Sequence, residues 1–332
     1  MPDILLLPVL AAFFDVTVDE LLGYEPQLSR EQIQVVYHRL ASDFAEKPFE
    51  DVMNESMDLV KQYYACYPFL LHVSILWLNH FMLAKDQKRQ QEILVMIEKL
   101  CERILSECKD LLLCNNAASI KAMASLYGGK ADAVIESLAD IQDVNSMQNN
   151  ALLLAQAYLM AGRVKEADRA AQINMCRGIM EAFSSGTHLL AVYGAEPEKG
   201  KRVVQRMDAM IQAFELDQLD PNAIASYEYQ TAVLYASCGE ETTAYERLER
   251  YVRAVRTLYE QDMRPHGDDF FYELDSWYEN IELGKETVRD RKLIGQSVMA
   301  VFEHPVFQTL SDRKRMERLK REAARICGIG EV

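Results

Sequence analysis

Turn-forming residues are scarce in this chain. Its 332 residues include 14 glycines and 9 prolines, which is about 4% and 3%, below the ~7% and ~5% usual in proteins. A long chain with few turn formers is expected to form long helices with short connections. No segment alternates apolar and polar residues between hairpin turns, so no β-sheet is predicted. We therefore expect an all-α protein.

Positive charge is also in deficit. The 36 Lys and Arg residues oppose 51 Asp and Glu residues, so the formal net charge is −15. Such an acidic chain is unsuited to nonspecific binding of nucleic acid or of an anionic membrane. The 49% of hydrophobic and 26% of charged residues are typical of a soluble globular protein. At roughly 150 residues per domain, the length predicts two domains or one elongated array.

Recognisable catalytic and metal-binding motifs are missing. No Gly-rich phosphate loop and no Ser/His/Asp, Cys/His or paired-carboxylate pattern can be identified. His266 precedes Asp268 and Asp269, but no second His or Cys follows at ligand spacing. We expect a polar loop there, in which an aspartate caps the next helix. The sequence predicts a protein that is not an enzyme and that holds no metal or cofactor.

The cysteines and the longest uncharged stretch bear on localisation. The seven cysteines form no CxxC pair and no signal peptide is recognised, so we expect reduced thiols in a cytoplasmic protein. The 23 residues between Lys61 and Lys85 carry no Lys, Arg, Asp or Glu. However, Pro68 interrupts this stretch, and His72 and His80 would need polar partners in lipid. We therefore predict a buried helix and no membrane segment.

Apolar residues recur every three to four positions along most of the chain, which predicts helices. Ser29-Arg30-Glu31-Gln32 has the form of a capping box in front of a helix that contains Ile33–Phe44. Pro197 and Pro221 each follow an acidic residue and mark two further helix starts. From residue 49 onward, the predicted helices cover about 49–66, 68–84, 87–107, 110–127, 130–140, 147–161, 164–182, 185–193, 197–215, 222–238, 241–261, 268–283, 288–303 and 306–326.

Two segments share alanine, tyrosine, glycine and alanine at the same spacing: Ala155, Tyr158, Gly162 and Ala167, and then Ala232, Tyr235, Gly239 and Ala244. A further glycine, Gly128, lies 34 residues before Gly162, the glycine of the first segment. This pattern resembles the tetratricopeptide repeat, in which small residues let two helices pack closely and a glycine ends the first helix. The resemblance implies a tetratricopeptide-like α-solenoid of antiparallel helix pairs. From Gly194 to Gly239 the spacing stretches to 45 residues, so an irregular helical bundle remains the alternative.

Residues 2–23 read PDILLLPVLAAFFDVTVDELLG. The pattern predicts a short helix at 4–14, a turn at Asp15-Val16 and a second short helix that ends at Gly23. The segment closely resembles the C-terminal helices of the lambda-repressor/Cro-type helix-turn-helix domain of XRE-family bacterial regulators, which read P-D-x-x-x-L-x-x-L-A-x-x-F-x-V-S/T-x-D-E-L-L-G. The resemblance implies that residues 1–24 are the C-terminal remnant of a DNA-binding domain. In that family the recognition helices come before this segment, so we expect contact with DNA only through helices absent from this chain.

Many XRE regulators carry a C-terminal tetratricopeptide-like domain that senses a peptide or another small ligand and mediates dimerisation. The segment Phe302–Leu310 also resembles the closing H-P-x-F-x-x-L sequence of such proteins. The resemblance therefore implies that residues 25–332 form a tetratricopeptide-like sensor and dimerisation domain, with a peptide or small-molecule effector in its concave groove and a homodimer as the assembly.

Candidate ligand contacts lie on the predicted concave face. Asn115 and Asn149 are 34 residues apart and so occupy equivalent repeat positions. An asparagine amide can both donate to and accept from a peptide backbone, although asparagine is equally suited to capping a helix. The candidate ligand contacts are Asn115, Asn149, Gln156, Met160, Tyr229 and Gln230.

Two functions fit these features. The first is the ligand-sensing and dimerisation region of a bacterial transcriptional regulator, in which the effector changes the curvature of the solenoid. The second is a tetratricopeptide adaptor that docks another protein and has no direct role in transcription.

Overall fold

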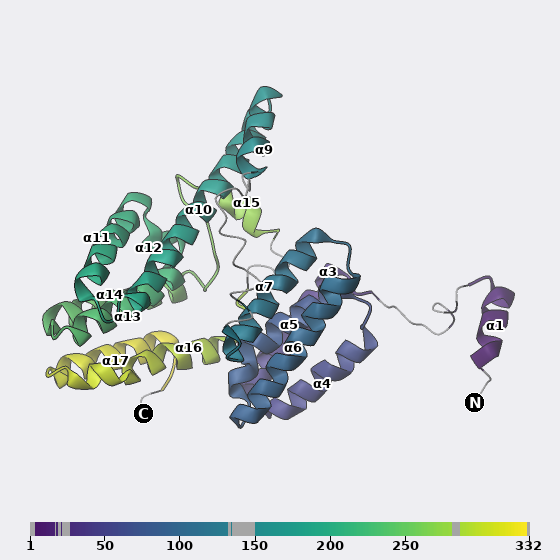
Figure 1. The fold of residues 1–332 in the computed structure, drawn as a ribbon, viewed down its shortest axis with the longest axis horizontal. Coiled ribbons are helices and arrows are strands. Elements are labelled where there is room, and N and C mark those ends of the chain that lie inside the picture. Colours follow the sequence, from purple (N-terminus) through teal and green to yellow (C-terminus); the bar gives the residue numbers. More distant parts are fainter. Residues whose placement is uncertain are drawn as a thin grey trace. The chain divides into compact units, whose positions relative to one another are not determined.

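The computed structural model describes residues 4–16, 18, 21, 27–131, 134, 150–280 and 286–330 (Figure 1). Its regular structure is helical, and no strand occurs among these residues. The prediction of an all-α protein is confirmed. The chain divides into two compact units, Met1–Ser146 and Met147–Val332. The domain boundary predicted at residue 24 lies outside the described residues, as does most of the second short helix predicted to end at Gly23.

The first unit surrounds helix α5. Its helices are α1 (Leu7–Phe14, after a 3-10 turn at Ile4–Leu6), α3 (Arg30–Glu46), α4 (Phe49–Gln62), α5 (Tyr67–His80), α6 (Gln87–Glu107) and α7 (Leu111–Tyr127), with a 3-10 turn at Phe81–Leu83 after α5. The structure confirms the predicted capping box of α3, because the Gln32 N–H donates to Ser29 Oγ and the Ser29 N–H donates to Gln32 Oε1, at 3.2 and 2.7 Å.

Helix α5 is the buried helix that the uncharged stretch predicts. It packs against α3, α4, α6 and α7. Its Trp77 indole N–H donates to the Ser56 hydroxyl at 2.8 Å. The two histidines bond to their own helix, since Nδ1 of His72 and of His80 lies 2.6 and 2.8 Å from the carbonyl oxygens of Pro68 and Leu76. Among the described helices, none combines the length and the apolar character that a bilayer span requires.

The second unit is a series of helical hairpins whose centre is α13 packed on α14. Its elements are α9 (Asn150–Met160), α10 (Val164–Val192), α11 (Pro197–Phe214), α12 (Leu216–Leu219), α13 (Pro221–Ser237), α14 (Glu241–Glu260), α15 (Leu274–Tyr278), α16 (Arg291–Ala300), 3-10 turns at Val301–Glu303 and Pro305–Thr309, and α17 (Arg313–Cys327). As Figure 1 shows, α10 runs from its hairpin with α9 to the layer of α11, α13 and α14.

Helix α10 differs from the prediction. The sequence predicts two helices here, at 164–182 and 185–193. The structure has one helix of 29 residues, Val164–Val192. A Cβ at Gly186 would lie 2.2 Å from Met207 Sδ on α11. The glycine therefore allows close packing of two helices, and it does not end one.

Two other predicted helices are shorter than expected. The helix predicted at 268–283 is described only as Leu274–Tyr278. In the loop before this helix, Asp268 Oδ1 accepts the N–H groups of Phe270 and Phe271, at 2.8 and 2.6 Å. The helix predicted at 306–326 is broken, because the Glu241 carboxylate accepts the N–H groups of Ser311 and Asp312, at 2.8 and 3.0 Å. Asp312 then caps α17.

Candidate functional site

The sequence-predicted contacts that the structure describes lie on three helices, one in the first unit and two in the second. Asn149 lies outside the described residues. Asn115 is exposed on α7 of the first unit, and Gln156 and Met160 are exposed on α9 of the second. Tyr229 and Gln230 are half-buried in α13. None of the five described residues lines the cavity described below.

Two of these residues have a local explanation. The capping alternative for Asn115 is wrong, because Asp110 caps α7 through the N–H groups of Leu112 and Leu113, at 2.8 and 3.2 Å. Asn115 lies inside the helix. Tyr229 packs against the closing segment, where its ring centroid is 6.0 Å from that of His304 and 6.4 Å from that of Phe307.

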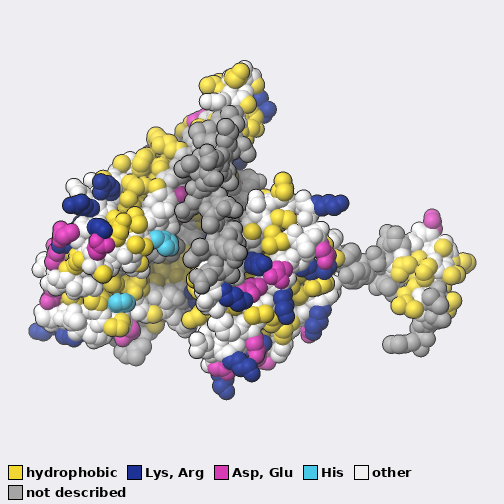
Figure 2. Space-filling model, viewed as in Figure 1, with side chains coloured by type: hydrophobic (Ala, Val, Ile, Leu, Met, Phe, Trp, Pro, Cys, Tyr) yellow, Lys and Arg dark blue, Asp and Glu magenta, His cyan; other side chains and the backbone are white. Residues whose placement is uncertain are grey.

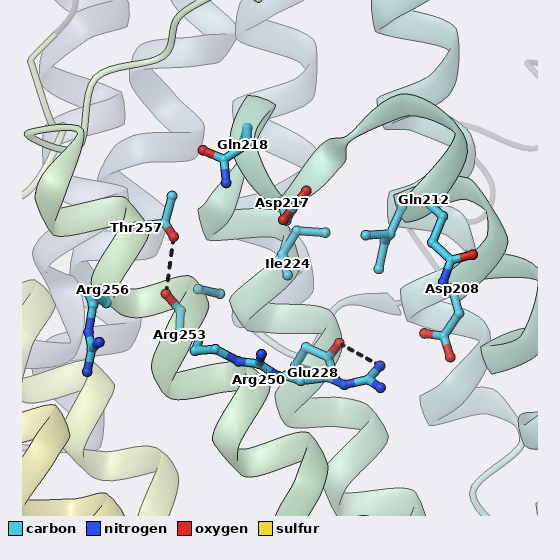
Figure 3. Close-up of a pocket in the computed structure, with 12 residues that line it drawn as sticks. Asp208, Gln212, Asp217, Gln218, Ile224, Glu228, Arg250, Arg253, Arg256 and Thr257 are labelled. Carbon is cyan, nitrogen blue, oxygen red and sulfur yellow. Dashed lines mark hydrogen bonds and ion pairs between the residues drawn. The ribbon is translucent and has the colours of Figure 1, made fainter.

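A cavity of about 640 Å³ lies among α11, α12, α13 and α14, which is within the size range of small-molecule sites. Figure 3 shows the arginines of α14 along one side, Asp217 and Gln218 of α12 across from them, and Glu228 of α13 beside Arg250. The cavity is lined by Asp208, Ile211, Gln212, Asp217, Gln218, Ile224, Glu228, Arg250, Arg253, Ala254, Arg256 and Thr257.

A buried ionic network underlies the cavity. Arg247 is only 6% exposed and forms two parallel bonds with Asp208, 2.9 and 2.6 Å long. The same guanidinium donates to Glu228 at 3.2 Å, and the Tyr227 hydroxyl donates to Asp208 at 2.8 Å. Such pairs stay charged in a protein interior only when their remaining polar atoms are satisfied. Here one guanidinium serves two carboxylates from different helices.

The pKa values of the two carboxyl groups in this network, Glu228 and Asp208, shift in opposite directions. Burial raises the pKa of Glu228 to about 7 although Arg247 and Arg250 lie close to it. Burial also acts on Asp208, but hydrogen bonds from Arg247 and Tyr227 outweigh it and hold the pKa of Asp208 below its ordinary value. The network therefore contains one carboxylate that is firmly ionised and one that titrates near neutral pH.

Local sequence explains how α12 faces the cavity. Glu215 has φ 48°, in the left-handed region, and separates α11 from the short α12. Leu216 and Leu219 of α12 are buried, so Asp217 and Gln218 between them face outward to the cavity. Asp220 then caps α13 by accepting the Ala223 N–H at 2.9 Å, next to Pro221 in its first turn.

Sequence reasoning missed the arginine row, although its signal is present. Arginines stand at every third position of α14: 247, 250, 253 and 256. At 100° per residue, positions three apart turn progressively around a helix, so the row runs from buried Arg247 to exposed Arg250 and Arg253. The acidic partners of this row come from α11, α13 and α17, and their proximity depends on tertiary packing.

The described residues offer no group of three or more His, Cys, Asp or Glu side chains placed to hold a metal ion. The seven cysteines are free thiols. The cavity combines guanidinium, carboxylate and amide groups over an apolar floor, an arrangement that suits recognition of a charged small ligand. In comparisons with protein-family models, curated proteins and solved structures, the chain has no match.

Proposed function

We propose that this chain contains the ligand-sensing and self-association region of an XRE-family transcriptional regulator. The observation that carries the proposal is the charged cavity among α11–α14. A cavity of this volume with a few convergent polar groups is the usual form of a small-ligand site. Because four helices line it, a bound ligand favours one arrangement of those helices over others.

The helix pairs of the second unit support the tetratricopeptide-like part of this proposal. In the α13–α14 hairpin, Ala232 and Ala244 are completely buried, as small residues between closely packed helices should be. Gly239 lies between these helices with φ +74°, and Gly162 lies between α9 and α10 with φ +72°. Gly128 is the glycine that the 34-residue spacing places before Gly162. There, the residue with a positive φ is its neighbour Gly129, at 76°.

Helix α1 supports the link to a DNA-binding domain. Ala11 of this helix is buried, but large apolar side chains face solvent: Ile4 in the preceding turn is 75% exposed and Phe13 is 80% exposed. Figure 2 shows apolar side chains over the surface of this segment. Large apolar side chains gathered on one short helix require a packing partner. The core of a helix-turn-helix domain, which the sequence of residues 2–23 resembles, would supply one.

Thermal unfolding and X-ray scattering of the full chain test this function. Peptide and metabolite libraries are added to wild type, to Gln212→Trp, which fills the cavity, and to the exposed neighbour Ala213→Trp as control. We expect at least one compound to stabilise wild type and the control by about 2–3 kcal/mol at 100 times its Kd, and to change their scattering profiles, but to leave Gln212→Trp unaffected. Light scattering should show a dimer.

The proposal fails if no compound changes the melting temperature or the scattering profile of wild type. It also fails if every stabilising compound acts equally on Gln212→Trp, because binding then occurs outside the cavity.

A further inference from the structure

Two of the seven free thiols lie together where α6 is joined to α7. Cys108 is the C-terminal cap of α6, and Cys114 lies in the first turn of α7, after the capping residue Asp110. The Cys114 thiol donates to the Cys108 carbonyl oxygen at 3.5 Å and is also hydrogen-bonded to the Cys108 thiol. A disulfide forms where two sulfur atoms can meet without large backbone movement, and thiols already in contact meet that condition.

Solvent reaches both thiols of this pair. The Cys108 and Cys114 side chains are half-buried, and residues 109–110 between them are exposed. Closing a bond between the two sulfur atoms therefore disturbs a short exposed connection and leaves the core of the first unit in place. Three other cysteines are buried, so a dissolved oxidant reaches them less easily: Cys66, Cys101 and Cys176.

The two sulfur atoms differ in their hydrogen bonds. The Asp110 N–H donates to Cys108 Sγ at 3.4 Å, and a donor directed at sulfur favours the thiolate, which is the form that attacks a peroxide. The Cys114 thiol instead donates its proton to the carbonyl oxygens of Cys108 and Ile104, and burial raises its pKa. Cys108 is therefore the thiol that reacts with an oxidant, and Cys114 is the thiol that closes the disulfide.

We propose that Cys108 and Cys114 are a redox modification site, at which hydrogen peroxide forms a reversible disulfide. The Cys108 thiolate attacks one peroxide oxygen, the O–O bond breaks, and Cys108 becomes a sulfenic acid. The hydroxide that leaves takes up the proton that the Cys108 thiol lost and becomes water. The Cys114 sulfur then attacks the Cys108 sulfur, the S–O bond breaks, and a second water leaves with the Cys114 proton. Two thiols are oxidised by two electrons, and one peroxide is reduced to two waters.

The disulfide closes a ring through residues 108–114 and ties the end of α6 to the start of α7. These helices pack against each other, so the bond fixes one end of their hairpin. The inference does not depend on the proposed sensing function, because the cavity among α11–α14 lies in the second unit. It assigns the first unit a chemistry of its own.

Peptide mapping of the oxidised full chain tests the site. Trypsin cuts after Arg103, Lys109 and Lys121, so the two cysteines fall on separate peptides, 104–109 and 110–121. Reduced protein is treated with hydrogen peroxide, and the remaining thiols are then blocked with N-ethylmaleimide. The digest is analysed by mass spectrometry without a reductant.

Three variants accompany wild type: Cys108→Ser, Cys114→Ser and the control Cys238→Ser. Cys238 is also half-buried, but it lies in the second unit. Serine differs from cysteine in one atom, so all three variants should fold, which circular dichroism verifies. A second set of samples is oxidised in the presence of dimedone, which traps sulfenic acids.

We expect wild type and Cys238→Ser to yield the two peptides joined, with a mass about 2 Da below their sum because two hydrogen atoms are lost. Dithiothreitol should separate them, and the oxidised protein should run as a single chain on a non-reducing denaturing gel. Cys108→Ser and Cys114→Ser should lose the joined species completely. Dimedone should label Cys108 in Cys114→Ser and leave Cys114 unlabelled in Cys108→Ser.

The inference is overturned if peroxide leaves the two peptides separate in wild type, or joins either of them to another cysteine or to a second chain. Labelling of Cys114 in Cys108→Ser, with none of Cys108 in Cys114→Ser, would overturn the order of the two steps.

Discussion

Among the residues of the cavity wall, Glu228 has a carboxyl group whose pKa lies near neutral pH. It is 3% exposed, and burial raises its pKa from an ordinary 4.5 to about 7. Arg247 and Arg250 of α14 face it and favour the charged form, while Asp208 of α11 opposes it. Between pH 4.5 and 7 the folded chain therefore holds a proton that the unfolded chain has released.

This proton makes stability depend on pH. Since the folded state binds more protons than the unfolded state in this range, Glu228 lowers the free energy of unfolding as pH rises from about 5 to 8. Glu228→Gln keeps the size and one acceptor oxygen for Arg247 but cannot ionise. We expect the stability of the variant relative to wild type to increase by about 1–3 kcal/mol from pH 5 to pH 8. Urea unfolding at four pH values measures it, and parallel curves for the two proteins would contradict the assignment.

Local features of single residues are predictable from the sequence, and ligand contacts are not. The Ser29–Gln32 capping box and the Nδ1 contacts of His72 and His80 depend on residues at most four positions away. Asn115 was equally well suited to two roles because asparagine serves both. That ambiguity is lifted only by Asp110, whose side chain occupies the cap.

At the scale of elements, the turns between paired helices follow from sequence. Gly162 and Gly239 end helices where the repeat pattern places them. The continuity of α10 through Gly186 does not follow, because a glycine that ends a helix and a glycine that admits a neighbouring side chain look alike in sequence. Only the position of Met207 separates the two. The arginine row of α14 was visible, but its partners lie on three other helices.

The α13–α14 turn gives a direct test. No atom lies within 4 Å of a Cβ built at Gly239, so Gly239→Ala introduces no clash. Its only cost is the backbone strain of an alanine at φ +74°, which should lower the free energy of unfolding by about 1–2 kcal/mol. The matched control is Gly178→Ala, inside α10 with equally open space, where alanine should stabilise the helix by about 0.5–1 kcal/mol. Chemical unfolding of both variants gives the two values. Changes of the same sign would refute this description of the turn.

For the whole molecule, the net charge limits which ligands approach easily. The chain carries a net charge of −15, which repels polyanions at long range. A ligand without net negative charge approaches without this barrier. The division at residue 146 into two units was not predicted, because helical periodicity continues on both sides and only long-range packing separates them.

The central claim is that the cavity among α11–α14 is the ligand site of a sensing domain, and calorimetry at Gln212 tests it most directly. The compound that stabilises wild type most is titrated into wild type, Gln212→Trp and the control Ala213→Trp. Our account predicts that Gln212→Trp abolishes binding, because the indole fills the cavity, and that Ala213→Trp binds as wild type does. Equal binding by Gln212→Trp and wild type would contradict it, because the compound would then bind outside the cavity.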